Sequence, residues 1–367
     1  MPTGLVMRST GSRYLVRGED GTLHNCVAKG TLRIKDWKST NPLAVGDRVE
    51  FLPQVNDEEV GAITELHDRR NYIVRRSVNL SHHKQVIAAN LDQALLLVTL
   101  ARPRTSYGFI DRFLVTAEIY RVPVIIVFNK VDDCTEEDLD RLAEYEDTYQ
   151  GAGYRTVITS AVKNIGVDEV RALIQGKVTL ISGHSGVGKS TLINALQPDL
   201  DLWTFEISAA SDKGQHTTTN AEMYELKPVV GSSLLVEGDR IDGSIDQVSD
   251  QQPRTNNQQP TSKNNQPQTT NHKQPSPNNQ QLPTFIIDTP GIKGFGLVDM
   301  DANEIVDQFP EMFARKNDCR FNDCKHMNEP GCAVKAAVED GTIAESRYAS
   351  YLDMVNGVDE EENYRTD

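Results

Sequence analysis

The residues whose types and spacing most clearly indicate chemistry form an eight-residue loop, Gly183-His184-Ser185-Gly186-Val187-Gly188-Lys189-Ser190, followed by Thr191. An apolar run at 178–181 precedes the loop and a helix-like segment follows it, so the loop joins a buried strand to a helix. Its glycines let backbone N–H groups converge on phosphate oxygens, beside the positive end of the helix dipole. Lys189 is expected to reach the β- and γ-phosphates, and Ser190 to offer its hydroxyl to Mg²⁺. The spacing predicts a phosphate-binding loop, the alternative being a glycine-rich turn without a ligand.

Two further motifs follow predicted buried strands upstream of this loop. Asn129, Lys130 and Asp132 come after the run 124–128, and Ser160 and Ala161 come after the run 155–159. Asp132 can accept hydrogen bonds from N1–H and the exocyclic amine of guanine, and adenine lacks both donors. Lys130 can lie along the base, and the backbone at 159–161 can contact the guanine oxygen. With the phosphate loop in the same sheet, these motifs predict GTP or GDP as the ligand.

Two downstream segments are expected to complete the site around Mg²⁺ and the γ-phosphate. The cluster Thr217-Thr218-Thr219 offers a second hydroxyl to Mg²⁺, which we assign to Thr218 although any of the three fits. Asp288 ends the apolar run 284–287 and is expected to hold Mg²⁺, while the N–H of Gly291 faces the γ-phosphate. The alternatives are a loop threonine cluster and a Pro-Gly turn at the end of a strand.

The chain lacks the glutamine that orients the attacking water in many GTPases. Where many GTPases have glutamine after the Asp-x-x-Gly motif, this chain has Ile292, which cannot orient water. We therefore assign catalytic roles to Lys189, to Gly291 and, as a hypothesis, to His216 beside the threonine cluster. Slow hydrolysis without a partner is expected, because the site would be incomplete.

A second constellation near the C-terminus consists of Cys319, Cys324, His326 and Cys332. Three thiolates and one imidazole within 14 residues provide a complete tetrahedral ligand set, which predicts one structural Zn²⁺ with no open position for catalysis. The alternative is a group of buried free cysteines with an incidental histidine. Cys26 and Cys134 have no such neighbours and are expected to be packed in the core.

The 367 residues carry a formal net charge of −15, with 38% apolar residues. Residues 1–90 contain 13 Lys/Arg and 10 Asp/Glu, a net of +3, which leaves −18 for the remainder. RNA contact is therefore compatible with the N-terminal part only. The chain has no apolar run of membrane-spanning length, and residues 1–17 have no signal-peptide core, so a cytoplasmic protein that does not contact membranes is expected.

The hydropathy pattern predicts a multidomain chain. Short strands with turns at 1–68 favour a small N-terminal β-barrel, an OB-fold or another small barrel such as an SH3-like one. Residues 69–90 are expected to form a basic linker, whose arginines either grip phosphates or are simply solvated. Strands alternate with helices over 91–298, which predicts a parallel sheet with helices on both faces. A Gln/Asn/Pro-rich insertion at 246–283 is expected to be disordered, followed by a mostly helical zinc-binding module at 299–358 and an acidic tail at 359–367.

The motifs occur in an unusual order, because guanine recognition precedes the phosphate loop and the Asp-x-x-Gly motif. The α/β domain is therefore expected to be a circularly permuted P-loop GTPase domain. The segment after Gly291 then leads to the zinc-binding module, so loss of the γ-phosphate could move that module.

The barrel, the permuted GTPase domain and the Cys-x₄-Cys-x-His-x₅-Cys pattern together resemble the ribosome small-subunit-dependent GTPase A (RsgA) family. The resemblance covers nearly the whole chain except 228–283 and the tail, and the insertion departs from the family pattern. It implies a GTPase that acts on the 30S ribosomal subunit late in its maturation, contacts 16S rRNA and is stimulated by the subunit; we expect a monomer. Two alternatives are a GTP-controlled RNA-binding module in which hydrolysis is incidental, and an assembly factor for another ribonucleoprotein.

Overall fold

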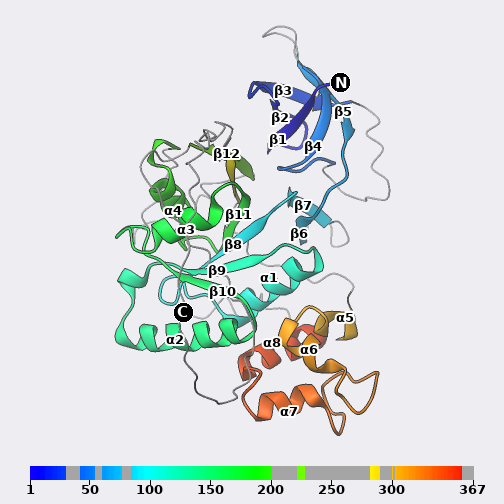
Figure 1. Cartoon of the computed structure of the whole chain (residues 1–367), viewed down its shortest axis with the longest axis vertical. Helices are drawn as coiled ribbons and strands as arrows, with labels where there is room; N and C mark the ends of the chain where they lie inside the picture. The colour runs from blue at the N-terminus through cyan, green and yellow to red at the C-terminus, as the bar shows by residue number, and fades with distance from the viewer. Residues whose placement is uncertain are drawn as a thin grey trace, which may run out of the picture. The chain divides into compact units, whose positions relative to one another are not determined.

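The computed structural model describes residues 1–29, 42–53, 60–76, 84–200, 221–227, 282–289, 300 and 302–357, coloured by residue number in Figure 1. Several predicted features lie outside these described residues, namely His216, Thr218, Gly291, the acidic tail 359–367 and all but the last two residues of the insertion 246–283. Within the described ranges, no helix has both the length and the apolar character that a membrane span requires.

The first five strands close into a small barrel. Strand β1 pairs with β2, β2 with β3, β3 with β5, β5 with β4, and β4 returns to β1. Alternate residues point inward, as on β2, where Tyr14 and Val16 are buried and Leu15 is partly exposed. This arrangement confirms the predicted OB-type barrel. The strands are β1 (Thr3–Ser9), β2 (Tyr14–Gly18), β3 (Leu23–Ala28), β4 (Arg48–Leu52) and β5 (Gly61–Leu66).

The residues expected to form a basic linker instead contain an ordered hairpin. Strands β6 (Tyr72–Arg76) and β7 (Lys84–Ala89) form an antiparallel two-stranded sheet. Ile73 lies opposite Ala88 in this sheet, and both are fully buried. The two strands form because their apolar side chains enter a core. The many basic residues in this stretch gave no indication of that core.

Two of the arginines in this stretch have structural partners. Arg69 forms two hydrogen bonds with the carboxylate of Asp47, from Nε to Oδ1 and from Nη2 to Oδ2, each 2.7 Å long. Asp47 is fully buried and also accepts a 2.7 Å hydrogen bond from the N–H of Ala44. Arg70 donates to the carboxylate of Asp92 and to the carbonyl of Leu91. These contacts lie within the chain, so the suggestion that this stretch grips phosphates is not supported for Arg69 and Arg70.

The central sheet has the predicted parallel strands. Its order is β10-β9-β8-β11-β13-β12, with β12 antiparallel at the end, and one residue pair, Arg8 with Glu222, joins β12 to β1 of the barrel. The strands are β8 (Gln93–Val98), β9 (Val124–Phe128), β10 (Arg155–Ile158), β11 (Val178–Gly183), β12 (Glu222–Leu226) and β13 (Thr284–Asp288).

Helices cover both faces of this sheet. On β8, Leu96 faces the cluster that contains the apolar residues of α1 and α2, whereas Leu95 and Leu97 face the cluster of α3 and α4. Strands buried on both faces explain the unbroken apolar runs in the sequence. The elements are α1 (Tyr107–Ile119), η1 (Val131–Asp133), α2 (Glu136–Gly151), α3 (Val167–Ile174), α4 (Lys189–Leu196) and η2 (Pro198–Leu200).

The C-terminal part is helical, as predicted, and it shares α1 with the central domain. Its apolar core contains Val115 of α1 together with residues of four further helices, and Ile119 of α1 packs against that core. Figure 1 shows these helices, in orange and red, beside α1, and α8 contacts α1 directly. The helices are α5 (Ala302–Val306), α6 (Pro310–Lys316), α7 (Ala333–Glu339) and α8 (Glu345–Val355). Helix α1 therefore has a buried partner on both of its sides.

The ion pair between Arg69 and Asp47 gives a stability prediction. We expect Arg69→Met to lower the free energy of unfolding by about 3 kcal/mol, because it leaves the buried carboxylate of Asp47 without its countercharge. Circular dichroism during urea denaturation measures this change. Arg48→Met is the matched control, since Arg48 is exposed on β4. Equal denaturation midpoints for the two variants would show that the Arg69–Asp47 pair does not stabilise the fold.

Candidate nucleotide site and metal centre

The predicted phosphate loop lies between a strand and a helix, as expected. Strand β11 ends at Gly183, helix α4 begins at Lys189, and Val187 between them is buried in the core below α4. Gly188 has a φ of +93°, and a Cβ at this position would lie 2.5 Å from Nδ2 of Asn129. Only glycine therefore fits here, both for its backbone conformation and for its close neighbour. His184 is half-buried, and Ser185 and Gly186 are exposed.

The ammonium of Lys189 lies over the loop. Its Nζ donates hydrogen bonds of 3.0 Å to the carbonyl of Gly183 and 2.8 Å to the carbonyl of His184. Burial lowers the pKa of Lys189 to about 8, and the nearby carboxylate of Asp288 opposes that shift. Phosphate oxygens would supply the negative charge that favours the protonated form. The role of Lys189 in holding the β- and γ-phosphates stays a prediction.

Asn129 is the hydrogen-bonding centre of the site. Its Nδ2 donates to the carbonyl of Val187 in the phosphate loop at 2.9 Å. Its Oδ1 accepts from Oγ1 of Thr159 at 3.0 Å and from the N–H of Ala161 at 3.2 Å. Asn129 is itself only 3% exposed. One side chain therefore joins the end of β9 to the phosphate loop and to the loop that follows β10.

The residues predicted to recognise guanine lie together beside Asn129. Ser160 donates a hydrogen bond from its Oγ to Oδ1 of Asp132, and this Oγ accepts one from the N–H of Lys163 at 3.1 Å. Lys130 is in the left-handed region with a φ of 64°, and its Nζ donates to the carbonyl of Arg102 at 3.0 Å. Asp132 is exposed, so its carboxylate can reach a ligand. No pattern in the sequence predicts the contact between Lys130 and Arg102.

Two of the residues predicted to hold Mg²⁺ are described by the structure, Asp288 at the end of β13 and Ser190 in the first turn of α4. Asp288 ends β13 directly opposite Ile181 on β11, and it is 3% exposed. Thr289, the next residue, donates from Oγ1 to the carbonyl of Ile181 at 3.0 Å, which fixes the backbone at this point. Ser190 and Thr191 belong to the first turn of α4, at the loop end of the neighbouring strand. The buried carboxylate of Asp288 lies close enough to Lys189 of the phosphate loop to influence its pKa, and carboxylate and hydroxyl oxygens are the ligands that Mg²⁺ prefers. The remaining predicted residues of the site, His216, Thr218 and Gly291, lie outside the described part of the chain.

An aromatic contact beneath the phosphate loop was not expected. The ring of Phe109, in the first turns of α1, packs on the ring of His184 with centroids 3.6 Å apart and planes at 30°. Phe109 is 1% exposed, and its N–H donates to the N-cap hydroxyl of Ser106. In the sequence Phe109 is one of several apolar residues at helical spacing, so only the tertiary structure distinguishes it.

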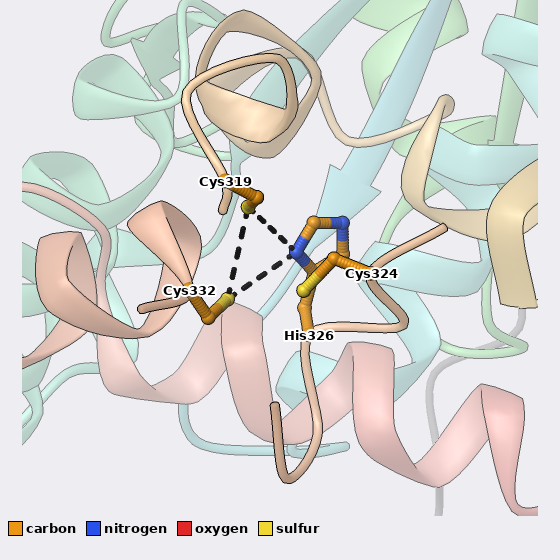
Figure 2. A group of neighbouring side chains, drawn as sticks. All are labelled: Cys319, Cys324, His326 and Cys332. Carbon is orange, nitrogen blue, oxygen red and sulfur yellow. Dashed lines mark hydrogen bonds between the residues drawn. The ribbon is translucent and has the colours of Figure 1, made fainter. Parts of the chain in front are cut away.

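The four predicted metal ligands converge near the C-terminus. The ligand atoms of Cys319, Cys324, His326 and Cys332 all lie within 4.8 Å of one another. Figure 2 shows these four side chains gathered together. The Sγ atoms of Cys319 and Cys332 are 4.0 Å apart, and Nδ1 of His326 lies 3.5 Å from the first and 3.3 Å from the second. Tetrahedral Zn²⁺ with its usual ligand bond lengths requires about 3.8 Å between sulfurs and about 3.5 Å between sulfur and nitrogen. The donor set therefore fits one tetrahedral Zn²⁺.

The surroundings of this cluster favour the neutral imidazole of His326 and donate hydrogen bonds to two of the sulfurs, whereas burial disfavours the thiolate of Cys324. The N–H groups of Ala333 and Lys335 donate to the sulfurs of Cys319 and Cys332, respectively. Burial lowers the pKa of His326, which keeps its ring neutral, and burial raises the pKa of the Cys324 thiol to about 12. A bound cation would offset the cost of thiolates in this space. Cys26 is buried elsewhere in the barrel core, and Cys134 is half-buried.

The hydrogen bonds of Asn129 give a prediction for ligand binding. We expect Asn129→Ala to weaken nucleotide binding by about tenfold or more, because it removes three hydrogen bonds that hold the two loops together, each worth about 1 kcal/mol. The dissociation constant of a fluorescent GDP analogue measures the effect. Gln150→Ala, an exposed amide on α2, is the control. Equal affinities for the two variants would contradict this assignment.

Comparison with known proteins identifies relatives along the whole chain. A family model described as the RsgA GTPase matches residues 66–235, and one described as the RsgA N-terminal domain matches residues 3–63. A protein from Flavobacterium johnsoniae named small ribosomal subunit biogenesis GTPase RsgA is 45% identical over 366 residues, covering 100% of this chain and 95% of that protein. A protein of the same name from Bacteroides fragilis is 46% identical over 357 residues, which is 97% of each.

Two solved structures share the fold. The crystal structure of YjeQ from Thermotoga maritima has 29% sequence identity and a TM-score of 0.66, covering 97% of this chain and 98% of that one. The structure of YloQ, described as a circularly permuted GTPase, has 23% identity and a TM-score of 0.61, covering 100% of this chain and 97% of that one. The match of both family models and the full-length relatives lead to one conclusion: the chain belongs to the RsgA GTPase family and is a GTP-hydrolysing enzyme with a circularly permuted nucleotide-binding domain.

Proposed function

We propose that this GTPase acts on the small ribosomal subunit late in its maturation, binding GTP at the carboxyl edge of the central sheet and hydrolysing it to GDP and phosphate. The observation that carries the proposed nucleotide site is the hydrogen bonding of Asn129, which unites the phosphate loop with both segments expected to bind guanine. The ribosomal role is supported by the relatives' name, small ribosomal subunit biogenesis GTPase.

Each part of GTP has a proposed partner in this site. The phosphate oxygens accept hydrogen bonds from the backbone of 183–191 and from the ammonium of Lys189. The carboxylate of Asp132 accepts from N1–H and the amine of guanine, Lys130 lies along the base, and Ser160 and Ala161 lie beside its oxygen. These contacts select guanine, because adenine would leave the carboxylate of Asp132 unpaired.

The hydrolytic step is attack of water on the γ-phosphorus, with cleavage of the bond to the oxygen that bridges the β- and γ-phosphates. Mg²⁺, held by Ser190, Asp288 and a threonine that we assign as Thr218, would neutralise charge on the β- and γ-phosphates. Lys189 and the N–H of Gly291 stabilise the γ-phosphoryl oxygens. His216 orients the attacking water, since Ile292 has no group that can do so.

The proposed partner is the 30S subunit with its 16S rRNA, which the chain binds as a monomer in the cytoplasm. The N-terminal 90 residues carry a net charge of +3 in a chain of net charge −15, so the barrel and hairpin are the parts best suited to phosphate backbones. OB-type barrels commonly bind oligonucleotides, which supports the same assignment.

GTP hydrolysis with and without purified 30S subunits tests this function, with ATP as the nucleotide control. We expect slow turnover of GTP alone, stimulation of tenfold or more by 30S subunits as an order-of-magnitude expectation for an incomplete site, and no stimulated turnover of ATP. Stimulation by 50S subunits instead of 30S subunits would overturn the proposed partner. Tight GTP binding with no stimulation would favour the alternative of a GTP-controlled RNA-binding module.

The same assay examines the proposed role of His216. His216→Ala is expected to lose most of the 30S-stimulated rate while keeping its affinity for GDP, because the side chain acts on water and not on the nucleotide. Full subunit-stimulated turnover in this variant would remove His216 from the mechanism. The GDP affinity, measured separately, distinguishes lost catalysis from lost binding.

We also propose that Cys319, Cys324, His326 and Cys332 hold one structural Zn²⁺. The support is the agreement between their spacing and the edges of a tetrahedral zinc site. All four ligands come from the protein, so the ion would stabilise the fold and leave no position for substrate. It would cross-link the segment between α6 and α7 to the start of α7.

Metal analysis gives the prediction for this site. We expect one zinc per chain, and we expect Cys324→Ser to reduce the zinc content at least severalfold and to lose helical signal, since structural zinc supplies about 10 kcal/mol or more of folding free energy. Cys134→Ser is the matched control, because Cys134 is a half-buried cysteine outside the cluster. Equal zinc contents in the two variants would refute the proposed ligand set.

A further inference from the structure

The side chain of Arg347 on α8 is fully buried between two acidic residues of different elements. Its Nη1 donates to Oδ1 of Asp111 on α1 at 2.6 Å. Its Nε and Nη2 donate to the two carboxylate oxygens of Glu311 on α6, at 2.8 and 3.2 Å. Asp111 is also fully buried. The guanidinium therefore connects the C-terminal helices to a helix of the nucleotide-binding domain.

Aromatic residues of the central domain and the C-terminal part enclose this cation. Its guanidinium carbon lies 4.5 Å from the ring centre of Phe309, 5.8 Å from that of Tyr149 and 5.7 Å from that of Tyr154. The hydroxyl of Tyr149 donates to Oδ1 of Asp111 at 3.0 Å. A buried ion pair often contributes no more to stability than apolar residues of similar volume would in its place. The charged network instead fixes one geometry, because the planar guanidinium matches its two acceptors only in one orientation.

Helix α1 also contacts the phosphate loop. Phe109 and Asp111 are two residues apart in the same helix, and the ring of Phe109 packs on the ring of His184. The N-cap hydroxyl of Ser106 accepts a hydrogen bond from the N–H of Phe109, which fixes the first turn. The same short helical segment therefore contacts the phosphate loop through Phe109 and α8 through Asp111.

We propose that Arg347 is a positioning residue for the nucleotide site: it holds α1 through Asp111, and α1 holds the phosphate loop through the contact between Phe109 and His184. By this route the C-terminal module affects the affinity for nucleotide, and bound nucleotide affects the order of the module. The route does not involve the chain segment after Gly291. Coupling between two sites is reciprocal, so a change in the module alters nucleotide affinity, and nucleotide alters the ordering of the module.

The first arm of the test measures GDP affinity in full-length variants with an intact metal site. Arg347→Lys keeps the charge but cannot contact Asp111 and Glu311 with a planar fork. We expect its dissociation constant for a fluorescent GDP analogue to rise about fivefold or more, the lower range of typical coupling between sites, with zinc content unchanged. Arg155→Lys is the matched control. Arg155 on β10 also forms an ion pair, with Glu169 on α3, but this pair is exposed.

The second arm tests the contact through α1 by measuring amide hydrogen exchange in α8 with and without saturating GDP. In the unaltered protein we expect GDP to slow exchange in α8. Phe109→Leu retains an apolar core residue but removes the ring that packs on His184, so we expect GDP to bind without slowing exchange in α8. This arm does not depend on the folding of Arg347→Lys.

The outcomes separate this inference from the proposed nucleotide site, on which it rests. Unchanged GDP affinity in a folded Arg347→Lys variant would overturn it, as would GDP-dependent slowing of exchange in α8 of Phe109→Leu equal to that of the unaltered protein. Failure of the unaltered protein to bind GDP would instead refute the nucleotide site. Lower affinity in Arg347→Lys, together with loss of the exchange effect in Phe109→Leu, would support the coupling through α1.

Discussion

The hydrogen bonds of Asn129 are the interaction on which the nucleotide site depends. This side chain lies at the end of β9 and binds the phosphate loop after β11 and the loop after β10. The three strands are parallel, so their carboxyl ends meet at one edge of the sheet. The buried amide then converts three separate loops into one rigid edge, because any displacement would leave buried hydrogen-bonding groups unpaired.

The permuted order of the chain leaves this edge intact. In the sequence, the guanine motifs precede the phosphate loop and Asp288 comes last, yet β8, β9, β10, β11 and β13 lie in one parallel sheet. The site needs the strand ends to be neighbours in space and makes no demand on their order along the chain. Permutation changes which segments continue beyond the domain, and here the chain after β13 continues into the helices of the C-terminal module.

Helix α1 gives the C-terminal module a second connection to the central domain. From the sequence, the module was expected to respond to the nucleotide only through the covalent connection after Gly291. In the structure, Val115 belongs to the core of the module, Asp111 pairs with Arg347 and Phe109 reaches the phosphate loop. Because α1 is packed on both sides, neither the module nor the sheet can shift against it without disrupting a close-packed interior.

The sequence by itself determined the classes of element, the strand–loop–helix position of the phosphate loop and the four clustered metal ligands. Local patterns suffice for these features, since a phosphate loop and the Cys-x₄-Cys-x-His-x₅-Cys pattern each lie within a short segment. The pairing of β6 with β7 was not predicted, because the basic residues of 69–90 indicated a linker, although Ile73 and Ala88 enter a core. Only the tertiary structure revealed the pairing of Arg69 with Asp47, of Arg347 with Asp111 and of Phe109 with His184. These partners are 22, 236 and 75 positions apart, and no local period in the sequence specifies which distant side chain will neutralise a buried charge or cover a ring.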